Sequence, residues 1–114
     1  MSDNGFQPIT HEAELEQRIA LHPALAVWFF SSKCEICSSL KPRLERFFTD
    51  SFPRMSLAEV ACAALPQTAA AHSVFSVPTL IVYLEGRASL RATRHIPLAT
   101  LGPRLQRSYD LLFS

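Results

Sequence analysis

The sequence has almost no excess charge and no long hydrophobic run. Eleven basic residues balance ten acidic residues, which leaves a formal net charge of +1 with both signs interspersed. Five arginines, Arg87, Arg91, Arg94, Arg104 and Arg107, make the last third locally basic, a pattern that is usually a solvated face. The longest apolar run, residues 23–30, is far too short to cross a bilayer. We therefore expect a soluble protein whose partners include neither nucleic acid nor a membrane.

Cysteine is also scarce. Three cysteines are an odd number, and residues 1–5 show neither the basic start nor the apolar run of a secretory signal. Small secreted domains usually have an even number of cysteines, so a reducing compartment, the cytoplasm, fits better. A zinc site needs four ligands, and besides Cys34 and Cys37 only Cys62 and four irregularly spaced histidines are available. We expect no metal and no cofactor.

A length of 114 residues and an apolar content of 48% predict one domain over residues 1–114 with one hydrophobic core. Residues 24–30 form an unbroken apolar stretch rich in β-forming side chains, which predicts a central parallel strand covered on both faces. Before it, Thr10 predicts the cap of a helix over residues 11–21. After it, apolar side chains recur at helical spacing through Phe48 and predict a second helix, kinked at Pro42.

The rest of the chain predicts a strand, a short helix, a hairpin and a last helix. The expected elements are residues 55–62, 65–72, 78–83 and 88–93, and a helix starting at Pro97. Glu85 and Gly86 supply the hairpin turn, and Gly102-Pro103 is expected to bend the last helix or delay its start. The order predicts an α/β fold, with a central mixed sheet of four or five strands flanked by helices on both faces. Residues 24–30 and 79–84 are expected to lie side by side in the sheet.

The chemistry is concentrated in Cys34-Glu35-Ile36-Cys37, where the buried strand gives way to a helix. A cysteine at a helix N-terminus faces unpaired backbone N–H groups and the positive end of the helix dipole, which favour the thiolate. We expect Cys34 to be the more exposed, attacking thiolate and Cys37, on the same helical face, to be the resolving thiol. The alternatives are a structural disulfide and half of a zinc site. Cys62 is expected to be a small buried side chain rather than a third redox group.

The chain resembles the thioredoxins. The shared features are the apolar strand at residues 27–30, the cysteine pair, Pro42, Ser76-Val77-Pro78-Thr79 before a buried strand and Gly86 in the hairpin. They span nearly the whole chain. The resemblance implies the thioredoxin fold, a cis peptide bond before Pro78 that stands against the cysteines, and a Val77 backbone that pairs with an extended substrate segment. Val77 and Pro78 are therefore candidate substrate-binding residues.

The motif departs from the thioredoxin pattern Trp-Cys-Gly-Pro-Cys. Lys33 replaces the tryptophan, and Glu35 and Ile36 replace the Gly-Pro dipeptide. Lys33 favours the thiolate of Cys34 and Glu35 opposes it, so the redox potential cannot be taken from the family. Because they surround Cys34, Lys33, Glu35 and Ile36 are also candidates for contacting the substrate.

Three further positions differ from the thioredoxin pattern. Trp28 occupies the place of the family's buried aspartate, and Glu59 the place of a lysine that stands beside that aspartate. Glu59 is therefore the candidate acid/base for Cys37, expected beneath it, unless its side chain points to solvent. Arg94 corresponds to a glycine in the family's substrate groove, and a bulky cation there narrows or repurposes the groove.

The leading hypothesis is a thiol–disulfide oxidoreductase that reduces disulfide-containing client proteins in the cytoplasm and is recharged by a partner reductase. The alternative is a thioredoxin-fold binding or assembly adaptor with little general reductase activity, since a fold does not fix function. Both cysteines of the motif are present, which favours redox work, because an adaptor has no physical need for two thiols at a helix N-terminus.

Overall fold

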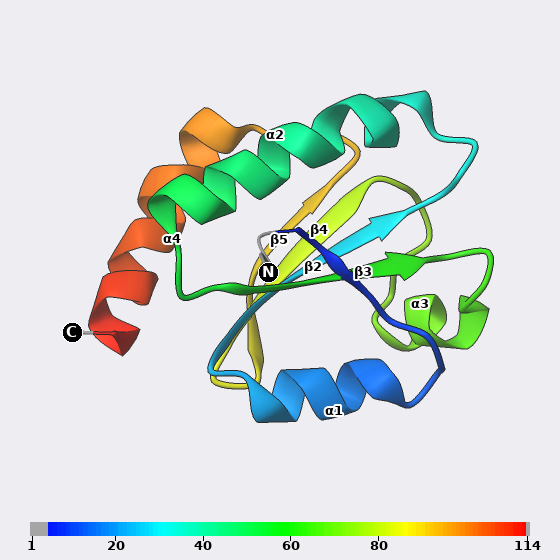
Figure 1. The fold of residues 1–114 in the computed structure, drawn as a ribbon, viewed down its shortest axis with the longest axis horizontal. Helices are drawn as coiled ribbons and strands as arrows, with labels where there is room; N and C mark the ends of the chain where they lie inside the picture. The colour runs from blue at the N-terminus through cyan, green and yellow to red at the C-terminus, as the bar shows by residue number, and fades with distance from the viewer. Residues whose placement is uncertain (1–4, 114) are drawn as a thin grey trace.

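Five strands form one mixed sheet in the computed structural model, which describes residues 5–113 (Figure 1). The strands are β1 (Gln7–Pro8), β2 (Ala24–Phe30), β3 (Ser56–Ala61), β4 (Thr79–Leu84) and β5 (Arg87–Thr93). Their order across the sheet is β1-β3-β2-β4-β5, so β2 is central. β3 pairs parallel with β1 and β2, whereas β4 pairs antiparallel with β2 and β5. The predicted mixed sheet, with β2 beside β4, is confirmed.

Four helices cover the sheet on both faces, as predicted. They are α1 (Glu14–Leu21), α2 (Glu35–Ser51), α3 (Pro66–Ala71) and α4 (Leu98–Leu112). α2 and α4 lie on one face, and α1 and α3 lie on the other (Figure 1). The short helix and the later strands agree with their predicted ranges to within about one residue at each end, which is the usual uncertainty of element boundaries.

The two faces of the sheet explain why β2 is apolar throughout. Alternate side chains of a strand point to opposite faces, and here each face is covered by helices. Residues such as Trp28 belong to the core beneath α2 and α4, whereas Val27 and Phe29 belong to the core beneath α1 and α3. Residues 24–29 of the strand are therefore buried, and its last residue, Phe30, is partly exposed.

The first helix begins later than predicted. It was expected over residues 11–21 with Thr10 as its cap, but α1 begins at Glu14, and its N-cap, Ala13, provides no side-chain hydrogen bond. The Thr10 N–H and hydroxyl instead donate to Glu14 Oε1 at 2.7 and 2.9 Å. The Thr10 hydroxyl, which was expected to cap the helix, therefore donates to the side-chain carboxylate of the first helical residue instead.

Two prolines lie inside helices, and the predicted hairpin turn joins two strands. Pro42 is within α2 and Pro103 is within α4, which begins directly after Pro97, so Gly102-Pro103 does not delay the start of α4. The predicted turn joins β4 to β5, and Glu85 and Gly86 have φ values of 51° and 82°. Two consecutive residues with positive φ are typical of a two-residue hairpin.

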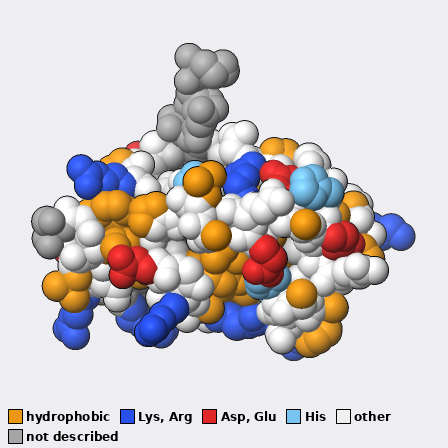
Figure 2. Space-filling model, turned by 90° about the horizontal axis from the view of Figure 1, so that it is seen from below, with side chains coloured by type: hydrophobic (Ala, Val, Ile, Leu, Met, Phe, Trp, Pro, Cys, Tyr) orange, Lys and Arg blue, Asp and Glu red, His pale blue; other side chains and the backbone are white. Residues whose placement is uncertain are grey.

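The helices within residues 5–113 lack the combination of length and apolar character that a membrane-crossing helix needs. Figure 2 views the molecule from the α1 and α3 side, where acidic, basic and histidine side chains are interspersed with apolar ones. No single charged region dominates this face. The sequence-based argument against a secretory signal rests mainly on residues 1–4, which lie outside the described residues.

Candidate active site

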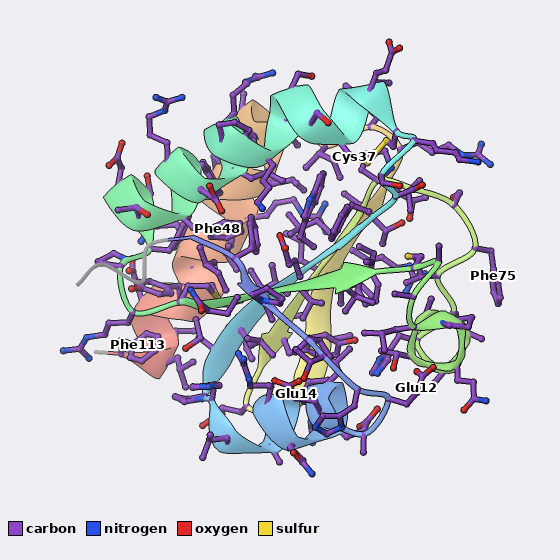
Figure 3. The ribbon with its side chains drawn as sticks, turned by 45° about the vertical axis from the view of Figure 1, so that its right-hand side comes forward. Glu12, Glu14, Cys37, Phe48, Phe75 and Phe113 are labelled. Carbon is purple, nitrogen blue, oxygen red and sulfur yellow. A yellow bond between two sulfur atoms is a disulfide. The ribbon has the colours of Figure 1, made fainter. Side chains whose placement is uncertain are left out.

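The two cysteines lie where the central strand β2 ends and the chain turns into α2. Figure 3 shows Cys37 at this end of α2. Ser31 shapes this turn: its carbonyl oxygen accepts the Cys34 N–H at 3.1 Å, and its hydroxyl oxygen accepts the Lys33 N–H at 3.2 Å. Cys34 is the N-cap of α2, with extended backbone angles of φ −94° and ψ 105°. The turn therefore places Cys34 at the start of the helix and Cys37 within its first turn.

Cys34 and Cys37 are joined by a disulfide, with their Cα atoms 5.2 Å apart. Cys34 is partly exposed, whereas Cys37 is only 3% exposed, so the expected difference in exposure is confirmed. The Cys34 Sγ accepts a hydrogen bond from the Cys37 N–H at 3.2 Å. Once the disulfide is reduced, the same N–H group and the positive end of α2 are placed to stabilise negative charge on this sulfur. Cys34 is thus both the sulfur that an outside disulfide can reach and the one whose anion the helix stabilises.

An open hollow over the disulfide brings together most of the predicted substrate-contacting residues. It is lined by Ser31, Lys33, Cys34, Glu35, Ile36 and Val77. Ile36 is 60% exposed, although it lies between the two cysteines. Val77 comes from a distant part of the chain, so the hollow exists only in the folded protein.

Pro78 and Arg94 meet beside this hollow through their backbones. The Val77–Pro78 peptide bond is cis, and the Pro78 carbonyl oxygen accepts the Arg94 N–H at 2.6 Å. Arg94 has φ 68°, in the left-handed region that favours glycine. Its side chain is exposed, and Arg94 is not among the residues that line the hollow over the disulfide.

A second, largely apolar hollow adjoins the first, and the two share Ser31 and Val77. Its other lining residues come from the loop after β3, from α3 and from the segment before Pro78: Cys62, Ala63, Pro66, Ala69, Ala70, Val74, Phe75 and Ser76. Sequence reasoning missed this hollow because no local pattern links the three segments. Cys62 is a free cysteine that packs against the core beneath α1 and α3 but is only partly buried, so the expected small buried side chain is confirmed only in part. Burial nevertheless raises the pKa of the Cys62 thiol.

These exposures predict the order in which the reduced thiols react with iodoacetamide. Cys34 should be labelled first, because it is accessible and its thiolate is stabilised. Cys62 should follow more slowly because of its raised pKa, and Cys37 should be last because it is buried. Mass spectrometry of samples quenched at successive times measures the order, and faster labelling of Cys37 than of Cys34 would reverse the assigned roles.

Glu59 points toward the helix that bears the cysteines and not to solvent. It pairs in register with Trp28, and its side chain is only 12% exposed. Lys41 Nζ lies 2.8 Å from Glu59 Oε1, so the two side chains form an ion pair. Oε1 is buried and has no hydrogen-bond partner within residues 5–113. Lys41 is four residues after Cys37, which places the two side chains on one face of α2. Lys41 was not predicted as a site residue, although its spacing of four residues from Cys37 places it on the same helical face.

Among residues 5–113, no three His, Cys, Asp or Glu side chains lie close enough together to hold a metal ion. The two cysteines of the motif are bonded to each other as a disulfide.

Comparison with known proteins gives one family. The family model described as Thioredoxin matches residues 7–105. The Thioredoxin-like protein YdfQ of Bacillus subtilis is 29% identical over 97 residues, which cover 85% of this chain and 86% of that protein. Thioredoxin-2 of Pyricularia oryzae is 23% identical over 78 residues, covering 68% of this chain and 45% of that protein.

Solved structures give the same fold. The thioredoxin of Trypanosoma brucei brucei superposes with a TM-score of 0.82 at 15% identity, over 96% of this chain and 95% of that chain. A mutant thioredoxin from Halobacterium salinarum NRC-1 superposes with a TM-score of 0.79 at 20% identity, over 96% and 94%. At these identities the likeness establishes the fold alone.

Proposed function

The chain belongs to the thioredoxin family, and we propose that it works as a single-domain dithiol reductant of client-protein disulfides in the cytoplasm, recharged by a partner reductase. A thioredoxin domain with a cysteine pair joined as a disulfide is, in general terms, a thiol–disulfide oxidoreductase. The observation that carries the proposal is the Cys34 sulfur, which accepts the Cys37 N–H at the start of α2 while Cys37 lies buried beside it.

In the first step, the Cys34 thiolate attacks one sulfur of the client disulfide. A bond forms between Cys34 and that sulfur, the client S–S bond breaks, and the second client sulfur leaves as a thiolate that takes a proton. Val77 borders the hollow over Cys34, and its backbone is available to a client segment that lies across it. Ile36 offers this segment an exposed apolar contact.

In the second step, Cys37 loses its proton and attacks Cys34. The Cys34–Cys37 disulfide forms, the bond to the client breaks, and the first client sulfur leaves as a second thiolate. Two electrons have then passed to the client, and a reductase must return two electrons and two protons to the pair. We propose Glu59 as the acceptor of the Cys37 proton. Its carboxylate is held beneath α2 by the ion pair with Lys41, which is one helical turn after Cys37.

Glu59→Gln tests this proton transfer. It should slow resolution of the mixed disulfide by about a hundredfold, because the amide cannot accept the proton, and should leave the first attack by Cys34 intact. Stopped-flow single turnovers with an excess of client, followed across a range of pH, separate the two steps. Glu85→Gln, in the exposed hairpin turn far from the site, is the matched control. Superimposable pH profiles for Glu59→Gln and the wild type would show that Cys37 loses its proton directly to water.

Reduction of insulin, with thioredoxin reductase and NADPH supplied, tests the proposed function itself. The protein should accelerate precipitation of the insulin B chain and consume NADPH in proportion to the disulfides reduced. Acceleration with dithiothreitol but not with the reductase would support client reduction and reject this recharging partner. No acceleration with either would contradict the proposed activity.

An adaptor role is the second candidate function, and two observations favour it. Lys33, Glu35 and Ile36 replace the usual residues around the cysteines, and Arg94 lies beside Pro78 in place of a glycine. Stable client binding by a Cys34→Ala, Cys37→Ala double variant, together with no insulin reduction by the wild type, would favour the adaptor over the enzyme.

A further inference from the structure

The segment between α3 and Pro78 forms one wall of the apolar hollow. Residues 74–77 line the hollow, and Phe75 is 82% exposed and projects away from the body of the protein (Figure 3). The segment has no helix or strand of its own. Its C-terminal end is held by Thr79, whose hydroxyl donates to the Ser76 carbonyl oxygen at 2.8 Å. Its position therefore also depends on what holds its N-terminal end.

Arg91 of β5 binds the N-terminal end of this segment through both terminal nitrogens of its guanidinium group. Nη1 donates to the His72 carbonyl oxygen at 2.9 Å, and Nη2 donates to the carbonyl oxygen of the next residue, Ser73. Ser73 has φ 58°, the left-handed conformation common in the turn that ends a helix. The Val74 N–H, which donates to the Ala69 carbonyl oxygen at 2.8 Å, also holds this turn, and Arg91 adds a second anchor from β5. A planar guanidinium can bridge two successive carbonyls, which a single ammonium group does less well.

His72 is held from its other side by a chain of side-chain contacts. Its Nδ1 lies 2.8 Å from the Tyr83 hydroxyl, and its Nε2 lies 2.8 Å from a carboxylate oxygen of Glu16 in α1. Burial raises the pKa of Tyr83 to about 12, so its hydroxyl keeps its proton even in mildly alkaline solution. Residues from α1, β4 and β5 thus converge on the point where α3 ends and the segment begins.

We propose that Arg91 is a positioning residue that fixes the client-binding segment at residues 74–77, so that the protein favours protein disulfides over small ones. This inference rests on the proposed function. A protein client must lie along Val77 and the neighbouring hollow, whereas a small disulfide needs to reach only Cys34. Arg91 touches neither cysteine, so its loss changes client binding and not the redox step.

Steady-state kinetics of Arg91→Ala test this inference with two substrates, insulin and the small aromatic disulfide 5,5′-dithiobis(2-nitrobenzoate). We expect KM for insulin to rise about threefold to tenfold, while kcat, the turnover of the small disulfide and the redox equilibrium with glutathione stay unchanged. Arg91→Lys should fall between the variant and the wild type. Arg87→Ala is the control, since Arg87 is an exposed arginine at the hairpin end of the same strand.

Hydrogen exchange decides the structural part of the inference without any need for activity. The Val74 amide, which donates to the Ala69 carbonyl oxygen at 2.8 Å, should exchange about threefold to tenfold faster in Arg91→Ala than in Arg87→Ala. Unchanged exchange, an unchanged KM for insulin, or an equal loss with both substrates would overturn the inference. An inactive wild type whose Arg91→Ala variant still shows faster exchange would instead overturn the proposed function and leave the anchoring of the segment supported.

Discussion

Replacing Cys34 with serine is expected to lower the rate of protein-disulfide reduction by about a thousandfold or more, because a serine hydroxyl is not ionised at neutral pH and cannot form a mixed disulfide. Cys37→Ser should behave differently. Its Cys34 can still attack, but nothing releases the client, so the covalent intermediate accumulates. Insulin turnover measures the first effect, and non-reducing electrophoresis with mass spectrometry detects the second.

Cys62→Ser is the control variant, because it removes a thiol that lies outside the cysteine pair. Cys62 takes no part in the disulfide, so this variant should still form and resolve the mixed disulfide. The assigned roles are wrong if Cys34→Ser accumulates the intermediate and Cys37→Ser does not. Equal turnover by Cys34→Ser and the wild type would remove the pair from catalysis altogether.

Trp28→Ala is expected to lower the free energy of unfolding by about 3–5 kcal/mol. Trp28 is fully buried and its ring stacks on Phe6 with centroids 6.2 Å apart. Truncation removes a large apolar side chain from the core beneath α2 and leaves a cavity that the central strand cannot collapse to fill. Because native domains are stable by only about 5–15 kcal/mol, this loss is a large share of the total.

Urea unfolding followed by far-UV circular dichroism measures this loss, since the variant has no tryptophan to observe. Phe75→Ala is the matched control: it also removes a large aromatic side chain, but one that is 82% exposed, and should change the free energy by less than about 0.5 kcal/mol. A loss below about 1 kcal/mol for Trp28→Ala would contradict the packing seen around β2.

The central strands could be predicted because their burial is encoded locally. An unbroken apolar run such as Ala24–Phe30 is short for a helix and rich in β-forming residues, so it favours a strand covered on both faces. β1 was not predicted because Gln7–Pro8 is two residues long and exposed, and only its pairing with β3 defines it. The start of α1 was misplaced because Glu14 competes with the helix for the Thr10 hydroxyl.

The cysteine pair could be predicted for the same reason, since both thiols lie within one helical turn of each other. The contacts around them could not, because they join residues far apart in the sequence. Lys41 and Glu59 meet across α2 and β3, and Arg91 reaches back to His72 from the neighbouring hairpin. Such pairs depend on how the helices sit on the sheet, and no periodicity of one segment contains that information.

The central place of β2 has a consequence for how the protein is made. Both strands that flank it, β3 and β4, lie further along the chain, so β2 leaves the ribosome before either neighbour exists. Until they follow, the apolar side chains of β2 have no sheet to join, and α2 has no surface to pack against. Cys34 and Cys37 therefore emerge as two equally accessible thiols on a nascent chain. The difference in exposure between them arises only once β4 has been synthesised and the sheet has closed around β2.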